Sequence, residues 1–174
     1  MSKTFKQNKY GTVNGISMAN SGCGPTSVAD IVHNKDATIT PKKVAEWLYK
    51  KGYFSSAGTT RTGITEALKY YGFQSLYFTP EHTGKEGWNE AFELIKASRN
   101  SSVWAIFLVV GTKNGGKDNY WTNGGHYIAI TDYNPETGKL YVRDPGARNL
   151  TGYVNPEKLR FDTNAMWIIT RIKN

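Results

Sequence analysis

Residues 126–146 read HYIAITDYNPETGKLYVRDPG, and this stretch constrains the fold more than any other part of the chain. Its two ends alternate apolar and polar residues, as half-buried β-strands do, and PETG between them is a turn signal. Strands joined by such a short turn pair antiparallel. The sequence therefore predicts an antiparallel sheet, to which further apolar runs contribute strands at 74–78, 102–110 and 166–173.

Helical spacing dominates the first hundred residues instead. Apolar side chains recur there every three or four positions, as on the buried face of a helix. The predicted helices cover residues 25–34, 39–54, 59–73 and 85–100. Helices followed by strands predict an α+β fold, with N-terminal helices packed on a C-terminal antiparallel sheet. No Pro- or Ser-rich linker interrupts the sequence, so we expect one domain over residues 1–174.

The charge of the chain is strongly basic. Lys and Arg number 22 against 14 Asp and Glu, which gives a net charge of +8. Such a surface attracts nucleic acid, an anionic membrane or an anionic bacterial wall polymer, and charge alone does not choose among them. The cluster PKKVAEWLYKKGY (41–53) mixes basic and aromatic residues, but its lysines fit the solvated side of an amphipathic helix. No recognised nucleic-acid motif accompanies it, so we expect no specific nucleic-acid partner.

Several kinds of site and location are disfavoured by composition. A single cysteine excludes an intramolecular disulfide or a zinc site of several cysteines, and the three histidines are scattered, so we expect no metal and no cofactor. The start of the chain has no signal-peptide core, and the longest apolar run, Val103–Val110, is too short to span a bilayer. We expect cytoplasmic synthesis and no membrane insertion; action at a cell wall would then need non-classical or phage-mediated release. The oligomeric state stays open.

The only cysteine, Cys23, lies in an unusual setting. It stands between Gly22 and Gly24, directly ahead of Pro25, which suits the first turn of the predicted helix. Unpaired N–H groups at a helix N-terminus favour an anion and so lower the pKa of a thiol. The two glycines either leave room for a substrate beside the sulfur or serve a tight turn. This context favours a nucleophile over a buried structural cysteine.

A thiol nucleophile needs a base, and His126 is the best-placed candidate. His33 follows Cys23 by ten residues on the same helix, about 15 Å away, and His82 lies in a polar, exposed-looking segment. His126 instead opens the first strand of the predicted hairpin, and Asp144 closes the second. Antiparallel pairing brings these two ends together, whereas Asp132 lies near the turn and looks structural.

Cysteine, histidine and aspartate together supply the nucleophile, the base and the orienting acid of acyl transfer. An oxyanion hole would combine the Cys23 backbone N–H with one upstream side-chain donor. Gln7, Asn14 and Asn20 are the candidate donors, and their spacing does not rank them.

The segments SGCGPTSVADIV (21–32) and GGHYIAITDYNPETGKLYVRDPG (124–146) resemble the papain-like cysteine peptidases. The likeness is greatest to the branch of the double-glycine leader peptidases of bacteriocin export. The resemblance implies a papain-like fold, with Cys23 as nucleophile, His126 as general base, Asp144 as orienting acid and Gln7 as the oxyanion residue. It does not extend to residues 38–100, which match no pattern of that family and are candidates for substrate recognition.

The resemblance also bears on the substrate. Transporter members of the branch carry a membrane domain and an ATPase that this sequence lacks, whereas freestanding members resemble the peptidoglycan-cleaving domains of phage and bacterial lysins. We therefore expect a cysteine amidase or endopeptidase that hydrolyses amide bonds of cell-wall peptide, with a phage endolysin among the candidates. One alternative is a cysteine protease, deamidase or transglutaminase-like enzyme that acts on proteins. Another is a binding module that has lost catalysis.

Overall fold

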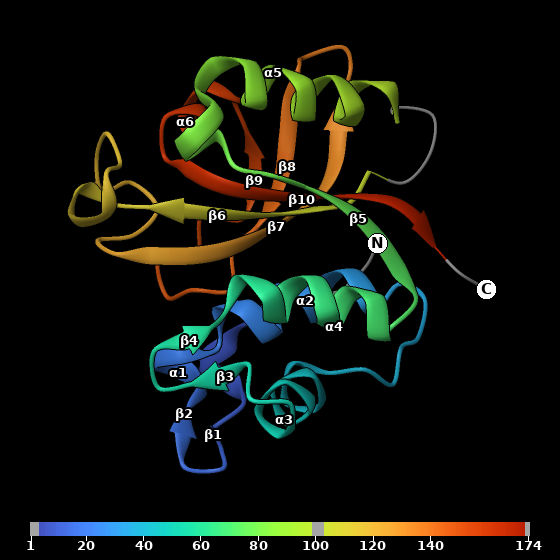
Figure 1. The fold of residues 1–174 in the computed structure, drawn as a ribbon, viewed down its shortest axis with the longest axis vertical. Helices are drawn as coiled ribbons and strands as arrows, with labels where there is room; N and C mark the ends of the chain where they lie inside the picture. The colour runs from blue at the N-terminus through green and yellow to red at the C-terminus, as the bar shows by residue number, and fades with distance from the viewer. Residues whose placement is uncertain (1–3, 99–102, 173–174) are drawn as a thin grey trace.

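A six-stranded antiparallel sheet forms the upper part of the molecule in Figure 1, and three helices gather beneath it. The computed structural model describes residues 4–98 and 103–172. The strand order across the sheet is β5-β10-β6-β7-β8-β9. These strands are β5 (Phe73–Phe78), β6 (Ala105–Val110), β7 (Gly125–Asn134), β8 (Lys139–Arg143), β9 (Gly152–Val154) and β10 (Thr163–Ile172).

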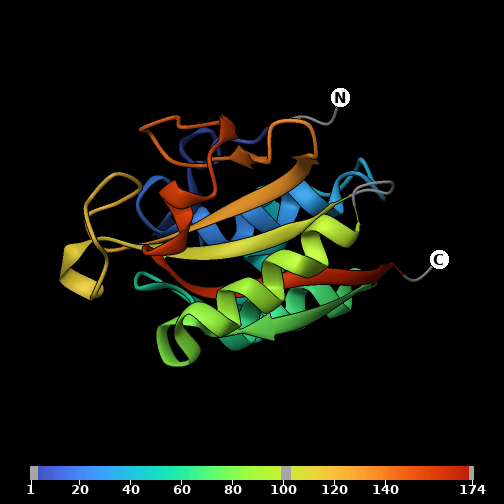
Figure 2. The ribbon, with the colours of Figure 1, turned by 90° about the horizontal axis from the view of Figure 1, so that it is seen from above.

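Helices cover both faces of this sheet. Below it in Figure 1 lie α2 (Cys23–Val32), α3 (Pro41–Lys50) and α4 (Arg61–Tyr70). Figure 2 shows α5 (Pro80–Ala97) running across the opposite face. The shorter elements are η1 (Gln7–Lys9), α1 (Met18–Ser21), η2 (Thr112–Asn114), α6 (Glu157–Arg160) and the hairpins β1 (Thr12–Val13)–β2 (Ile16–Ser17) and β3 (Phe54–Ser55)–β4 (Gly58–Thr59).

The helices differ in how their N-termini are satisfied. Thr40 caps α3 by accepting a hydrogen bond from the Lys43 N–H, and Thr60 caps α4 in the same way through Gly63. Helix α2 has no side-chain cap at Gly22, and every residue from Gly24 to Val32 is buried. The helix that carries Cys23 is therefore held by packing on all sides rather than by a cap.

Two apolar clusters lie on the two faces of the sheet. The first packs α2 and α4 against the sheet, with α3 packed on these two helices, and it includes Ile31, Leu48 and Trp167. The second packs α5 against it and includes Ile95 and Phe107. Each large side chain buried in this way contributes about 1.5–3 kcal/mol. Strand β6 supplies residues to both clusters, as its continuous apolar sequence predicts.

The predicted α+β class and the antiparallel sheet are confirmed, since every strand pair in the sheet is antiparallel. The boundaries differ in physical detail. Helix α2 begins at Cys23 rather than at Pro25. Helix α5 begins at Pro80 rather than at residue 85, because a first helical segment precedes a break at Gly84, whose φ is 63°. The predicted helix end at 99–100 and the strand ends at 102 and 173 lie outside the described residues.

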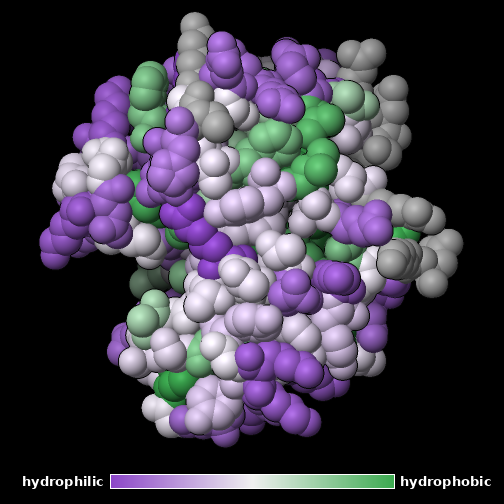
Figure 3. All heavy atoms as spheres, in the orientation of Figure 1, coloured by the Kyte–Doolittle hydropathy of each residue, from purple (hydrophilic) through white to green (hydrophobic). Residues whose placement is uncertain are grey.

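The first 22 residues are rich in Gly, Asn and Ser, which is typical of a loop with a short strand. The β1–β2 hairpin agrees with this pattern, whereas η1 and α1 were not predicted. Strand β9, helix α6 and the β3–β4 hairpin were also not predicted, because elements of two to four residues show too little periodicity. In the parts of the chain that the structure describes, no helix is long and apolar enough to cross a membrane. Figure 3 shows the molecule indented between its upper and lower parts, on the side where β6 ends and β7 begins.

Candidate active site

Cys23 lies at the first position of α2, directly after the short helix α1. A Cβ atom added to Gly22 would lie 2.6 Å from the Met18 carbonyl oxygen, and one added to Gly24 would lie 2.5 Å from Thr59 Oγ1. Real Cβ atoms do not approach other atoms so closely. The structure therefore explains both glycines by close packing around Cys23 rather than by access for a substrate.

His126 and Asp144 meet at the end of the β7–β8 hairpin, as the turn between these strands predicts. His126 Nε2 lies 2.7 Å from Asp144 Oδ1. The Asp144 side chain is only 1% exposed, and its carboxylate also accepts hydrogen bonds from the backbone N–H groups of Gly146 and Leu150, each at 2.9 Å. The two N–H groups hold the carboxylate, and the carboxylate in turn fixes the orientation of the imidazole ring.

Cys23 interacts with the same imidazole. Because His126 Nε2 bonds to Asp144, Nδ1 is the ring nitrogen left to face the sulfur. Burial by itself raises the pKa of the Cys23 thiol, but hydrogen bonding to His126, the charge of that ring and the backbone N–H groups of Tyr127 and Gly24 outweigh it. The net effect lowers the pKa of the thiol and favours the thiolate.

The pKa values of His126 and Asp144 are shifted in the directions that favour their charged forms. Burial lowers the pKa of His126, but hydrogen bonds to Asp144 and Cys23 and the charges of both groups raise it to about 9. Burial likewise opposes ionisation of Asp144, yet the bonds from His126, Leu150 and Gly146 and the nearby imidazolium charge lower its pKa to about 2. At neutral pH the arrangement thus favours a thiolate beside an imidazolium, which is the reactive form of a cysteine nucleophile.

Gln7 is the one candidate oxyanion donor that lies inside this constellation. Its backbone N–H donates to the Pro145 carbonyl at 3.0 Å. Its side-chain Nε2 donates to the carbonyls of Met18 at 3.1 Å and Ala19 at 2.8 Å, and its Oε1 is buried without a hydrogen-bond partner. Gln7 therefore joins the loop after Asp144 to the helix before Cys23.

The two rival amides lie elsewhere. Asn14 sits in the turn of the β1–β2 hairpin with a φ of 50°, and it borders a groove along α3. Asn20 is exposed on α1. The structure thus separates the three amides that the sequence left unranked.

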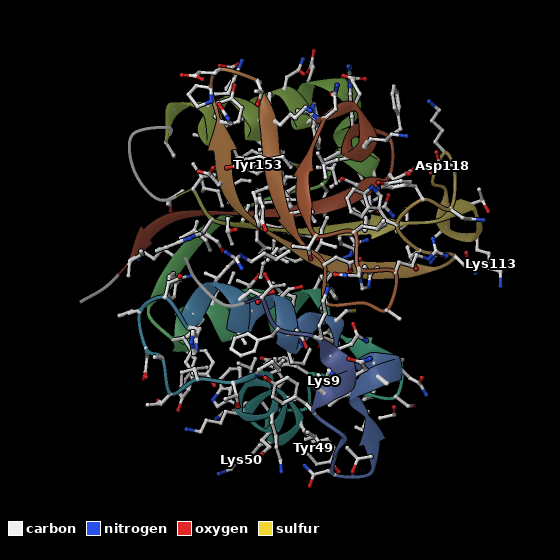
Figure 4. The ribbon with its side chains drawn as sticks, turned by 180° about the vertical axis from the view of Figure 1, so that it is seen from behind. Lys9, Tyr49, Lys50, Lys113, Asp118 and Tyr153 are labelled. Atoms are coloured by element: carbon white, nitrogen blue, oxygen red, sulfur yellow. The ribbon has the colours of Figure 1, made fainter. Side chains whose placement is uncertain are left out.

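The residues set aside as structural have other partners. His33 Nδ1 bonds to the Ile39 carbonyl at 3.0 Å, and its ring packs edge-on against Phe5. The His82 side chain is 76% exposed. Asp132 accepts a hydrogen bond from the Tyr153 hydroxyl. Figure 4 shows Tyr153 on the sheet, well apart from the loop that bears Lys113 and Asp118 and leads into β7.

Sequence reasoning missed several groups that support the site. Lys6 Nζ donates to the Asp144 carbonyl at 2.6 Å. Arg148 donates to the carbonyls of Asn119 and Tyr120 and to Asn123 Oδ1, and so ties the loop after Asp144 to the loop before His126. Basic residues in loops look like solvated charges in a sequence, so no pattern marks these contacts.

A metal site does not accompany the cysteine. In the described ranges, which omit residues 1–3, 99–102 and 173–174, no group of three or more His, Cys, Asp or Glu is placed to hold a metal ion.

Comparison with known proteins adds a family to this geometry. The model of the Peptidase_C39 like family matches residues 3–171. No curated protein gives a significant match. Among solved structures, the peptidase domain of Streptococcus ComA, a bi-functional ABC transporter involved in a quorum-sensing pathway, is similar at a TM-score of 0.57 and 20% identity, over 93% of this chain and 99% of that one.

A putative C39-like peptidase from Bacillus anthracis is similar at a TM-score of 0.53 and 17% identity, over 88% of this chain and 91% of that one. At such identities the likeness shows the shared fold. The predicted papain-like fold of this branch is confirmed.

Proposed function

The chain belongs to the Peptidase_C39 like family of cysteine peptidases, and we propose that it hydrolyses amide bonds of bacterial cell-wall peptide through Cys23, His126 and Asp144. The observation that carries this proposal is the 2.7 Å contact between His126 Nε2 and Asp144 Oδ1, on an imidazole that also faces the thiol. Nucleophile, base and orienting acid stand in the order that acyl transfer requires.

The mechanism follows from the protonation states. The Cys23 thiolate attacks the scissile carbonyl, and the carbon–oxygen double bond opens to an oxyanion. As the tetrahedral intermediate collapses, the carbon–nitrogen bond breaks and His126 Nδ1 gives its proton to the leaving amine. A water molecule, deprotonated by the now neutral His126, then attacks the thioester. The products are a carboxylic acid and the restored thiolate–imidazolium pair, while Asp144 holds the ring throughout.

We assign the oxyanion hole to the Cys23 backbone N–H and Gln7. The Cys23 N–H lies at the start of α2, where the helix dipole also favours negative charge. Gln7 lies in η1 and reaches the helix before Cys23 through its side chain. Because both amide hydrogens of Gln7 are directed at the carbonyls of Met18 and Ala19, donation to an oxyanion requires release of one of these bonds.

The cell wall is our proposed substrate because the net charge of +8 suits an anionic polymer. A phage endolysin is the form of this activity that we propose. A peptide or protein substrate would use the same three residues and differ only in what the surrounding surface binds.

Product analysis tests the proposal. Purified peptidoglycan is incubated with the wild type and with Cys23→Ala, and soluble products are analysed by mass spectrometry for new amino and carboxyl ends. We expect muropeptide products from the wild type alone, with both proteins showing the same folded circular dichroism spectrum.

Two other outcomes are informative. Equal release by both proteins would refute the role of Cys23. Intact peptidoglycan together with Cys23-dependent cleavage of casein or a peptide library would refute the wall substrate and leave a peptidase of another specificity.

A further inference from the structure

Tyr127, the residue after His126, makes a long-range contact of its own. Its hydroxyl donates to the Thr59 carbonyl at 2.9 Å across 68 positions of sequence. The side chain is only 5% exposed, and its ring packs on Trp167 with 5.9 Å between centroids. Burial first of all raises the pKa of this hydroxyl far above its usual value, so it stays a donor throughout the working range of pH. The bond therefore joins strand β7 firmly to the β3–β4 hairpin.

The hairpin in turn presses on the residues that flank the nucleophile. Thr59 Oγ1 comes so close to Gly24 that no Cβ fits there. On the other side of Cys23, Ser21 Oγ donates to the Ser56 carbonyl at 2.8 Å. The start of α2 thus touches the hairpin both before and after Cys23.

Tyr127 also reaches the nucleophile directly through its backbone. Its N–H is one of the groups that stabilise the Cys23 sulfur as an anion. A single residue therefore contacts the sulfur with its main chain and, with its side chain, holds the hairpin that packs against the next residue, Gly24.

These contacts matter because nucleophile and base come from different layers. Cys23 belongs to the helical layer and His126 to the sheet. The Cys23–His126 contact depends on how the two layers are set against each other. Errors of about 1 Å in such an alignment cost about 100-fold in rate.

We propose that Tyr127 is a positioning residue, which sets the Cys23–His126 contact by fastening the β3–β4 hairpin to strand β7. The proposal rests on the assignment of Cys23 and His126 to catalysis under the proposed function. Tyr127 touches neither the substrate nor the reacting carbonyl in this account. It acts by holding the start of α2 at the correct distance from the imidazole.

The test is the variant Tyr127→Phe, which removes one oxygen atom and keeps the ring on Trp167. Cys23 is the only cysteine in the chain, so the rate of its alkylation by iodoacetamide against pH gives the pKa of this thiol alone. We expect the apparent pKa to rise by at least one unit toward the ordinary value of about 8.5. At pH values below the measured pKa of the wild-type thiol, alkylation should slow about 10-fold, because each unit of pKa changes the thiolate fraction tenfold there.

A matched control is available on the same tryptophan. The Tyr77 ring lies 4.9 Å from that of Trp167, and its hydroxyl accepts a hydrogen bond from Arg61 at 3.2 Å. Tyr77→Phe therefore makes the same chemical change beside the same ring without touching the hairpin, and we expect the alkylation profile of the wild type.

Two variants of Thr59 examine the hairpin from its other side. Thr59→Val keeps the shape and removes a buried hydroxyl that has no hydrogen-bond partner, so thiol reactivity should not change. Thr59→Gly keeps the carbonyl that Tyr127 binds but removes the packing over Gly24, and it should raise the thiol pKa as Tyr127→Phe does. If Tyr127→Phe fails to fold, the thiol pKa of Thr59→Gly tests the proposal instead: a raised pKa supports it, and an unchanged pKa overturns it.

The results separate this proposal from the function on which it rests. A lower melting temperature of Tyr127→Phe with an unchanged alkylation profile would show a merely structural role and overturn the proposal. In wall digestion assays, kcat should fall 10- to 100-fold with KM changed less than twofold. Because alkylation needs no substrate, absence of wall cleavage in the wild type would refute the proposed function and leave the alkylation test of Tyr127 valid.

Discussion

Replacement of Asp144 by Asn should move the alkaline limit of activity by more than two pH units. Burial opposes the charged form of His126, and the hydrogen bond and charge of Asp144 are among the main forces that keep its pKa near 9. Without that charge we expect the pKa of His126 to fall to the ordinary value near 6.5 or below. The thiolate–imidazolium pair exists only between the pKa of Cys23 and that of His126, so its upper limit falls with the latter.

The magnitude follows from these pKa values. At pH 8 a group with a pKa of about 9 is roughly 90% protonated, whereas one with a pKa near 6.5 is roughly 3% protonated. The population of reactive pairs at pH 8 should therefore fall about 30-fold in Asp144→Asn. At pH 6 the loss should be much smaller, because both proteins still carry mostly protonated His126 there. The measurement is kcat/KM on the substrate found by product analysis, from pH 5 to 10.

The free energy of unfolding should also depend on pH, because the pKa values of Asp144 and His126 differ between the folded and the unfolded chain. The pKa of Asp144 is about 2 in the fold and about 3.9 in an unfolded chain, a difference worth about 2.6 kcal/mol. Because the folded pKa is depressed, this contribution is present above pH 4 and is lost as the pH falls through about 2. His126 has the opposite sign, since its raised pKa stabilises the fold below about pH 6.5 and loses that effect as the pH rises through about 9. The two shifts describe one interaction in part, so they are not summed.

Asp132→Asn is the matched control for this prediction. It makes the same change on the same hairpin, but Asp132 is exposed and bonds to Tyr153. Its pH profile should coincide with that of the wild type. If the alkaline limits of Asp144→Asn and wild type coincide as well, Asp144 does not control the protonation of His126 and the reasoning fails.

Three further predictions follow from single contacts. Gly24→Ala places a methyl group against Thr59 Oγ1 and should destabilise the fold by about 1–3 kcal/mol in urea denaturation; equal midpoints would contradict this. Gln7→Ala should lower kcat by about 100- to 1000-fold with the thiol pKa unchanged, whereas a normal kcat would remove Gln7 from the oxyanion hole. Burial raises the pKa of Asp30 to about 8, although the Phe5 N–H and two nearby cations oppose this rise. The wild type should therefore lose stability relative to Asp30→Asn as the pH rises from about 4 to about 8, and a constant difference over that range would argue against a buried titration.

The sequence predicted the parts of the site that depend on local geometry. The PETG turn places His126 beside Asp144, because the register of a short hairpin follows from its turn, and the His126 Nε2–Asp144 Oδ1 distance of 2.7 Å agrees. The position of Cys23 at a helix start followed from the Gly and Pro residues around it. Both predictions needed only neighbours along the chain.

The remaining features depend on which distant segments pack together. In the sequence, Gly24 is compatible with room for a substrate beside Cys23 or with a tight turn. In the structure, a side chain at Gly24 would collide with Thr59, which lies 35 residues away in a hairpin too short to be predicted from the sequence. Gln7 could not be ranked against Asn14 and Asn20, because its burial depends on Pro145 from the other end of the chain. Periodicity shows which face of an element is buried and does not say what covers it.

The proposed catalytic pair, Cys23 and His126, is split between two layers and so needs contacts across their boundary, which the chain supplies at both sides of the site. On one side Tyr127 binds the hairpin that packs over Gly24. On the other side the N-terminal segment binds the loop after Asp144, through Gln7 N–H and Lys6 Nζ. Neither set of ties contributes a reacting atom. Because the large clusters on both faces of the sheet stabilise the fold independently of these few hydrogen bonds, loss of a tie should lower reactivity at Cys23 well before it unfolds the protein.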